Sequence, residues 1–111
     1  ATESFDDLYA DIFPDWLLGR LKELGFIYPT AIQKYCLEEI LSGDDVIVRA
    51  QTGSGKTLCY LLPLLASIDA SRSAIQAVIL VPTRELGLQV TRVARKLICS
   101  DQNIMVMPIL Q

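Results

Sequence analysis

The chain has 111 residues, 51% of them apolar, and a formal net charge of −3. This length allows one small domain with a hydrophobic core, and the apolar content excludes an intrinsically disordered chain. The longest hydrophobic stretch, Leu58 to Ala66, is too short to cross a bilayer, and no secretory signal is recognisable, so we expect no membrane association.

The cysteines and the distribution of charge further limit the kinds of protein that this chain can be. Three cysteines, Cys36, Cys59 and Cys99, occur at spacings that are typical neither of a disulfide framework nor of a zinc site, and histidine is absent. We therefore expect reduced thiols in an intracellular protein. Residues 1–24 hold six acids and two bases, whereas residues 25–111 hold seven acids and eight bases. Contact with a nucleic acid would thus depend on a few positively charged side chains at specific positions, because the protein as a whole carries no net positive charge.

Helical patterns come first along the chain. A leucine stripe predicts a helix from Pro14 to Leu24, and a second is expected from Thr30 to about Leu41. The helical spacing of apolar residues ends after this helix, and the short apolar run 46–48 is typical of a buried strand. A glycine-rich loop follows at 50–55, and an apolar helix is predicted from about Gly55 to Ile68, with a bend at its internal proline.

The alternation continues after this helix. Residues 76–81 predict a second strand, and residues 104–110 predict a third. Between them a helix is predicted from Arg84 to about Ile98, and its apolar stripe consists of Leu86, Val90, Val93 and Leu97. Strand and helix in alternation indicate an α/β fold, a parallel sheet with helices on both faces. The loops 50–55 and 82–84 both follow strands, so they should open on the same edge of the sheet, where ligands bind.

The segment 50–57 fits the phosphate-loop pattern G-x-x-x-x-G-K-[ST], except that alanine stands at its first position. Gly53 and Gly55 let the backbone N–H groups approach an anion. Lys56 supplies a positive charge for the β and γ phosphates, and Thr57 a hydroxyl for Mg²⁺. The alternative is a glycine-rich turn without a ligand, and the preceding strand and following helix favour the nucleotide site.

Thr30 and Gln33 allow two interpretations. Their spacing is that of a capping box, which stabilises a helix start without any function. Resemblance to a known family supplies the other. Residues 25–33 (GFIYPTAIQ) resemble the Q motif of the DEAD-box RNA helicases, AQTGSGKT at 50–57 resembles their motif I, and PTRELGLQ at 82–89 resembles their motif Ia. Ala50 is the residue that this family carries at the first loop position.

The resemblance covers residues 4–111 and implies an ATP-dependent RNA helicase. It implies that residues 1–24 are an N-terminal flank with the first helix, and that 25–111 are an incomplete RecA-like ATP-binding domain, truncated after about the third strand. The cofactors implied are ATP and Mg²⁺, with Lys56 and Thr57 catalytic and the Thr57 hydroxyl on the metal. The cofactor-binding residues implied are Phe5, Tyr28, Thr30, Gln33, Thr52, Gly53, Ser54, Gly55, Lys56 and Thr57.

Two of these roles have alternatives. Gln33 would read the adenine edge, since an amide both donates and accepts hydrogen bonds, but the capping box competes for the same side chain. An upstream aromatic ring is expected to stack on adenine. Phe5 is the first candidate, Tyr9 or Phe13 could serve instead, and Phe5 could equally be a core residue.

The resemblance also implies that Pro82, Thr83 and Arg84 hold the RNA backbone without reading bases. The turn leaves N–H groups for a phosphate, and Arg84 can add a bidentate contact. The alternative is a helix cap at Thr83 with an ion pair between Arg84 and Glu85. Arg92, Arg95 and Lys96 are expected to form a solvated face of the same helix.

The Asp-Glu-Ala-Asp motif, the Ser-Ala-Thr motif and the second RecA-like domain of the family do not occur in these residues. We therefore expect the parent protein to be an ATP hydrolase that unwinds short RNA duplexes, and this chain alone to be inactive. In the family, other strands lie between the motif I and motif Ia strands, so open edges and a domain-swapped or intertwined homo-oligomer are expected. The alternative functions are a non-catalytic RNA- or partner-binding module and another P-loop NTPase or kinase. Residues 83–95 resemble plant organellar members, a hint of a chloroplast location, and the cytoplasm or nucleus is the alternative.

Overall fold

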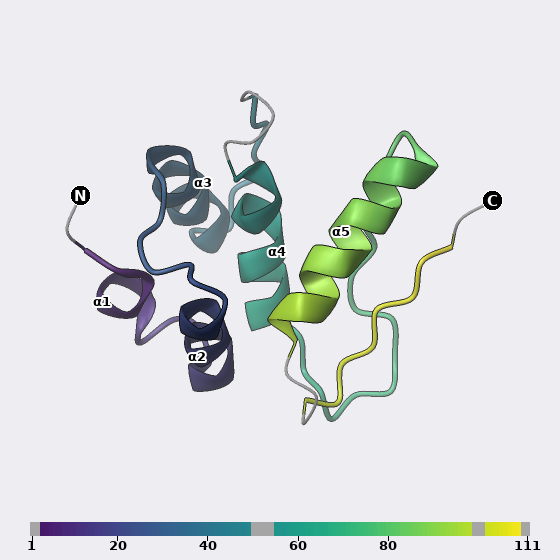
Figure 1. Ribbon diagram of the computed structural model, residues 1–111, viewed down its shortest axis with the longest axis horizontal. Coiled ribbons are helices and arrows are strands. Elements are labelled where there is room, and N and C mark those ends of the chain that lie inside the picture. The colour runs from purple at the N-terminus through teal and green to yellow at the C-terminus, as the bar shows by residue number, and fades with distance from the viewer. Residues whose placement is uncertain (1–2, 50–54, 99–101, 110–111) are drawn as a thin grey trace. The chain divides into compact units, whose positions relative to one another are not determined.

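The computed structural model describes residues 3–49, 55–98 and 102–109, and these residues form five helices (Figure 1). They divide into two compact units, Ala1–Ser67 (unit 1) and Ile68–Gln111 (unit 2). The helices are α1 (Phe5–Tyr9), α2 (Asp15–Glu23), α3 (Ala31–Leu41) and α4 (Lys56–Ala66) in unit 1, and α5 (Arg84–Leu97) in unit 2. No helix within the described ranges is long and apolar enough to span a membrane.

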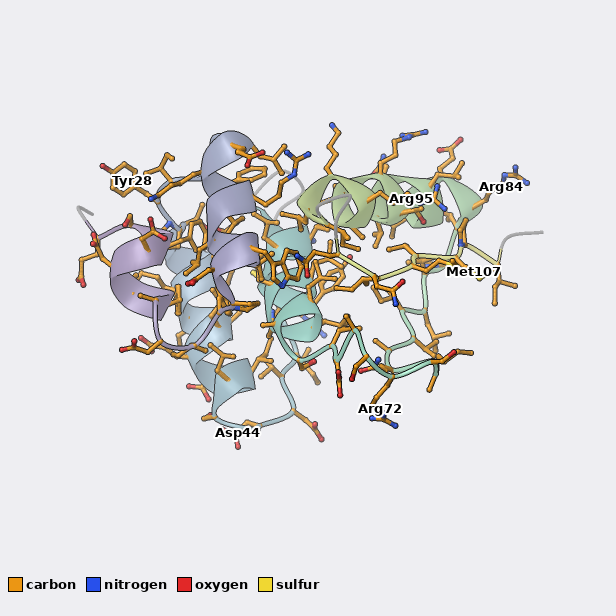
Figure 2. The ribbon with its side chains drawn as sticks, turned by 90° about the horizontal axis from the view of Figure 1, so that it is seen from below. Tyr28, Asp44, Arg72, Arg84, Arg95 and Met107 are labelled. Carbon is orange, nitrogen blue, oxygen red and sulfur yellow. The ribbon has the colours of Figure 1, made fainter. Side chains whose placement is uncertain are left out.

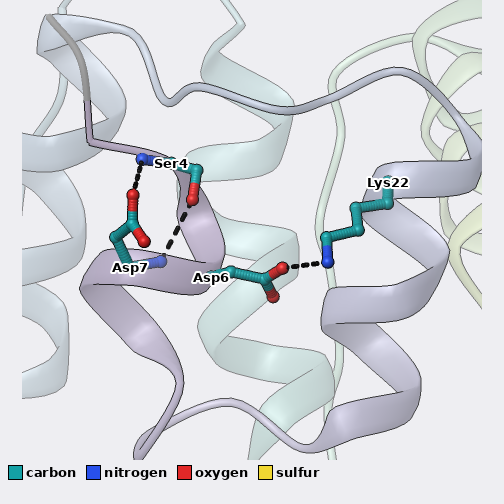
Figure 3. A network of polar contacts seen from close by, with 4 residues as sticks. All are labelled: Ser4, Asp6, Asp7 and Lys22. Atoms are coloured by element: carbon teal, nitrogen blue, oxygen red, sulfur yellow. Dashed lines mark hydrogen bonds and ion pairs between the residues drawn. The ribbon is translucent and has the colours of Figure 1, made fainter.

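The short helix α1 begins at a capping box. The Ser4 hydroxyl accepts from the Asp7 backbone N–H at 3.1 Å, and the Asp7 carboxylate accepts from the Ser4 N–H at 3.0 Å (Figure 3). These hydrogen bonds from Ser4 lower the pKa of Asp7. Asp6 forms an ion pair with Lys22 of α2, and this contact raises the pKa of Lys22. The polar contacts join α1 to α2 at the surface of unit 1.

The leucine stripe of α2 packs inward largely as predicted. Leu17, Leu18 and Leu21 are buried, while Leu24 is half-buried at the end of the helix. Gly25 has φ +86° and donates to the carbonyl of Lys22, which is the left-handed geometry that glycine allows after a helix. The end of this helix predicted at Leu24 is confirmed to within one residue.

The centre of unit 1 is the contact between α3 and α4. The core residues that these two helices supply are Cys36, Leu37, Leu58, Cys59, Leu61, Leu62 and Leu65. As predicted, α4 is mostly buried, and Pro63 lies within it. The packing of α4 on α3 fixes the position of the residues at the start of each helix.

In unit 2, α5 buries a different stripe from the predicted one. Leu86 is 38% exposed and Val93 is half-buried. The buried face comprises Gly87, Val90, Thr91, Ala94 and Leu97. Gly87, Thr91 and Ala94 lie on the same side of the helix as Val90 and Leu97, because helical positions three or four residues apart share a face. A prediction that counts only strongly hydrophobic residues misses them.

The three predicted strands are not formed among the described residues. Segments 46–48, 76–81 and 104–109 are extended or irregular, without ladder hydrogen bonds. Several of their apolar side chains are exposed, with Ile47 and Leu80 each 91% exposed and Ile109 94%. A strand is defined by pairing with a neighbour, and no described segment supplies that partner. The parallel sheet therefore stays a prediction.

Polar contacts hold the chain of unit 2 in place of a sheet. The Asp69 backbone N–H donates to the Gln76 side chain at 2.8 Å, and the Gln76 amide donates to the Asp69 carbonyl at 2.7 Å. The Asn103 amide donates to the Ala70 carbonyl at 3.3 Å, and the Arg95 guanidinium donates to the Val106 carbonyl at 2.9 Å. These contacts join 68–76 to 102–106, and 102–109 to α5.

Candidate nucleotide-binding site

Gln33 links the start of α3 to the start of α4. Its Oε1 accepts from the Thr30 N–H at 2.9 Å, and its backbone N–H donates to the Thr30 hydroxyl at 3.2 Å. The predicted capping box is therefore confirmed. The Nε2 of the same side chain donates to the carbonyl of Gly55 at 3.2 Å, across 22 residues of sequence. Gln33 is only 4% exposed, and both the oxygen and the nitrogen of its buried amide have one hydrogen-bond partner.

Gly55 occupies a position that a larger residue could not take without strain. It is the N-cap of α4 with φ +83°, a left-handed conformation. A Cβ atom built there would lie 2.4 Å from the Gln33 Nε2. Both the backbone angle and the close approach of the amide explain why glycine stands before this helix.

The first residues of α4 carry the groups suited to phosphate. Lys56 and Thr57 are the first two residues of the helix, and both are half-buried. A helix N-terminus presents unpaired N–H groups and a partial positive charge, both favourable to an anion. Of the predicted loop residues, Thr52, Gly53 and Ser54, with Ala50 and Gln51, lie outside the described residues.

The upstream aromatic residues pack with one another. Phe5 is 3% exposed, and its N–H donates to the Ile27 carbonyl at 2.9 Å, which attaches α1 to the segment before Thr30. The rings of Phe5 and Tyr9 have centroids 6.2 Å apart, and those of Tyr9 and Phe13 are stacked at 5.0 Å. All three rings are thus core residues here. Tyr28 is 59% exposed and points outward (Figure 2).

Two cysteines, Cys36 and Cys59, lie one helical turn beyond Gln33 and Gly55, and they were not among the predicted site residues. The Sγ of Cys59 lies 3.8 Å from the Gly55 carbonyl and 3.9 Å from the Ile32 carbonyl. Burial, together with contact with the Cys36 thiol, raises the pKa of Cys59 to about 12. The signal was present in the sequence, because Cys36 is one helical turn after Gln33 and Cys59 one turn after Gly55.

The predicted RNA-contacting residues lie in unit 2. The Thr83 hydroxyl accepts from the Leu86 N–H at 3.2 Å, so the predicted cap of α5 is confirmed. Arg84, the first residue of α5, is exposed and points away from the helix (Figure 2). Arg92, Arg95 and Lys96 are exposed as expected, although Arg95 also bonds the Val106 carbonyl. No group of His, Cys, Asp or Glu side chains with metal-binding geometry occurs in 3–49, 55–98 or 102–109.

Comparisons with known proteins show the family of the chain. The family model of the DEAD/DEAH box helicases matches residues 30–110. The DEAD-box ATP-dependent RNA helicase 58, chloroplastic, of Arabidopsis thaliana is 53% identical over 80% of this chain and 19% of its own length. The ATP-dependent RNA helicase DeaD of Haemophilus influenzae is 46% identical over 78% of this chain and 14% of its own. The chain thus spans about a fifth or less of these relatives.

A solved structure also resembles the chain. The crystal structure of the RNA-helicase Prp28 from Chaetomium thermophilum bound to ADP is 40% identical and superposes with a TM-score of 0.67. The match covers 77% of this chain and 22% of the Prp28 chain. The similarity supports the α/β RecA-like fold class for a chain whose described residues form no sheet.

Proposed function

Because this chain belongs to the DEAD/DEAH box helicase family, we propose that it forms part of the ATP site of an ATP-dependent RNA helicase. The observation that carries the proposal is the hydrogen bond from the Gln33 amide to the Gly55 carbonyl. This bond holds the Gln33 amide, which is our candidate for reading adenine, next to the N-terminus of α4, which suits phosphate. One ligand that carries both a base and phosphates can therefore use both features.

Gln33 keeps the hydrogen-bonding capacity that adenine requires. A side-chain amide has two N–H donors and two acceptor lone pairs. The capping box uses one lone pair, and the Gly55 carbonyl uses one N–H. One donor and one acceptor remain, which matches the N7 and N6 groups of adenine. The cap and the adenine contact thus become compatible roles of the same side chain.

The start of α4 supplies the phosphate contacts of the proposal. Lys56 neutralises charge on the β and γ phosphates, and Thr57 offers its hydroxyl to the Mg²⁺ that accompanies ATP. The half-buried positions of both residues at the helix N-terminus are consistent with these roles. Thr52, Gly53 and Ser54 would complete the loop, Thr30 would hold Gln33 in place, and Tyr28 and Phe5 are the aromatic candidates for contact with the base.

We assign RNA contact to the start of α5, at Pro82, Thr83 and Arg84. The Thr83 cap positions the turn, Thr83 and Arg84 can offer backbone N–H groups to a phosphate, and Arg84 adds its guanidinium. Pro82 has no N–H and restricts the backbone of the turn. Such contacts read no sequence, so RNA of any sequence is the proposed partner. The chloroplastic names of the Arabidopsis and rice relatives support an organellar location, the chloroplast, for the parent protein.

Hydrolysis of ATP is expected to require more than these 111 residues. Phosphoryl transfer in this chemistry depends on acidic residues that hold Mg²⁺ and orient water, and the sequence contains no Asp-Glu-Ala-Asp motif. We expect the chain to bind ATP without turnover. Phosphate release stimulated by RNA, measured on this chain, would contradict the expectation.

The adenine role of Gln33 is tested by nucleotide selectivity. Calorimetric titration with Mg-ATP and Mg-GTP should show a preference for ATP, and Gln33→Glu should remove it. The carboxylate keeps the cap acceptor but loses the N–H donors, and one bidentate base contact contributes about 1–3 kcal/mol of discrimination. Gln89→Glu, at an exposed position of α5, makes the same charge change outside the proposed site and should keep the preference. Equal affinity of the unmodified chain for ATP and GTP would refute the role.

A further inference from the structure

Two buried thiols meet between α3 and α4. Cys36 is 1% exposed and Cys59 is 2% exposed, on two helices that pack against each other. The Cys59 Sγ lies 3.9 Å from the carbonyl of Ile32, which is one turn before Cys36 on α3. Contact with the Cys36 thiol also contributes to the raised pKa of Cys59. The two side chains are therefore neighbours in the contact between α3 and α4, although 23 residues separate them in the sequence.

The thiol pair shares an atom with the nucleotide site. The Gly55 carbonyl accepts the Gln33 amide at 3.2 Å, and the Cys59 Sγ lies 3.8 Å from the same oxygen. Cys36 follows Gln33 by one turn of α3, and Cys59 follows Gly55 by one turn of α4. A change in the thiol pair therefore acts on the two helices whose first turns carry the site.

We propose that Cys36 and Cys59 are a modification site, an oxidisable thiol pair whose disulfide weakens ATP binding at the adjacent site. The oxidant is a low-molecular-weight disulfide such as glutathione disulfide. One cysteine attacks the oxidant, forms a mixed disulfide and releases one glutathione thiol. The second cysteine attacks the sulfur of the first and releases the second glutathione. The pair loses two protons and two electrons, and the S–S bond of the oxidant takes them up to give two thiols.

Burial controls the rate of this reaction. The thiolate is the attacking species, and the raised pKa of Cys59 keeps that thiol protonated at neutral pH. The reaction therefore proceeds when α3 and α4 open locally, and it accelerates as the pH rises. A slow reaction suits a modification that reports sustained oxidation.

The effect on ATP follows from the contacts around Gly55, and it depends on the ATP site proposed above. An S–S bond of about 2.05 Å is much shorter than a contact between two thiols, so the disulfide draws the helices together. It also removes the Cys59 S–H from the Gly55 carbonyl. Gln33 and the first turn of α4 then shift relative to each other, and an allosteric coupling of this kind typically changes affinity about fivefold or more.

The modification is tested first without nucleotide. The full chain carrying Cys99→Ser is equilibrated in glutathione buffers of increasing oxidised fraction, blocked with N-ethylmaleimide, and digested with trypsin. Cleavage after Lys34, Arg49, Lys56 and Arg72 places the two cysteines in separate peptides, 35–49 and 57–72. We expect these peptides to become linked with loss of two hydrogens. Two unlinked, maleimide-labelled peptides in the most oxidising buffer would overturn the proposal.

The coupling is tested by ATP titration of the reduced and oxidised chain. We expect the oxidised form to bind ATP about fivefold or more weakly, with recovery after dithiothreitol. For Cys36→Ala and Cys59→Ala, the oxidant should change the affinity for ATP by less than twofold relative to the reduced form of the same variant. Equal affinity of the cross-linked and reduced chain overturns the coupling. A reduced chain that fails to bind ATP refutes the proposed function as well, while the peptide map still decides whether the disulfide forms.

Discussion

At the residue scale, the Gln33 amide and the Gly55 carbonyl connect the two halves of the candidate nucleotide site. Gln33 is buried, yet its amide keeps hydrogen-bonding capacity beyond its two internal contacts. Gly55 accommodates the amide because it has no Cβ. Both residues were singled out in the sequence for separate reasons, and the structure places them in contact.

Substitution of Gly55 tests this contact. Gly55→Ala should lower the free energy of unfolding by roughly 1–3 kcal/mol, because it combines a strained φ with a Cβ that displaces the Gln33 amide. Gly43→Ala is the matched control, since Gly43 has φ +93° but no atom within 4 Å of the added Cβ. It should cost only the backbone strain. The measurement is urea denaturation of each variant, and equal losses for both would show that the amide contact contributes nothing.

At the element scale, the helices follow local signals closely. The predicted helices 14–24, 30–41, 55–68 and 84–98 correspond to α2, α3, α4 and α5, with ends that differ by two residues at most. The helix α1 was missed, although Ser4 and Asp7 have the spacing of a capping box. The buried face of α5 was predicted only in part, because Gly87 and Ala94 carry little hydrophobic signal.

The cap of α5 offers a test at this scale. Thr83→Ala removes the acceptor for the Leu86 N–H and should destabilise the chain by about 1 kcal/mol. Thr83→Ser keeps a hydroxyl and should retain most of that stability. Urea denaturation of the two variants gives the comparison. Identical unfolding midpoints for Thr83→Ala and the unmodified chain would contradict a stabilising cap.

At the scale of the whole molecule, the extended segments carry apolar side chains that remain exposed. Four of them, Ile47, Leu80, Met105 and Ile109, are each at least 81% exposed, and Met107 is 74% exposed. Their backbones form no ladder in the part of the chain that the structure describes. Exposed apolar segments with unpaired backbones favour pairing with another chain. From this exposure we propose the domain-swapped or intertwined homo-oligomer that the sequence led us to expect.

Light scattering over a range of concentrations tests that proposal. The chain should associate as its concentration rises, and Leu80→Lys with Met107→Lys should reduce association, since charges on an edge oppose pairing. Ile12→Lys introduces one charge at a position that is 53% exposed and lies outside these segments, so it should leave association unchanged. A monomer at every concentration would count against the oligomer.

The sequence by itself predicted the helices α2 to α5 and the caps at Thr30 and Thr83. A capping box, or a glycine that ends a helix, involves only residues three or four positions apart. The contacts of Ser4, Thr30 and Gly25 are therefore visible in the local sequence pattern. Only the tertiary structure decided what lies side by side across long separations. It brought Gln33 to Gly55, packed the helices that carry Cys36 and Cys59 against each other, and buried Phe5 beside the ring of Tyr9. The predicted strands show the same distinction, because a strand depends on a partner that no local pattern supplies.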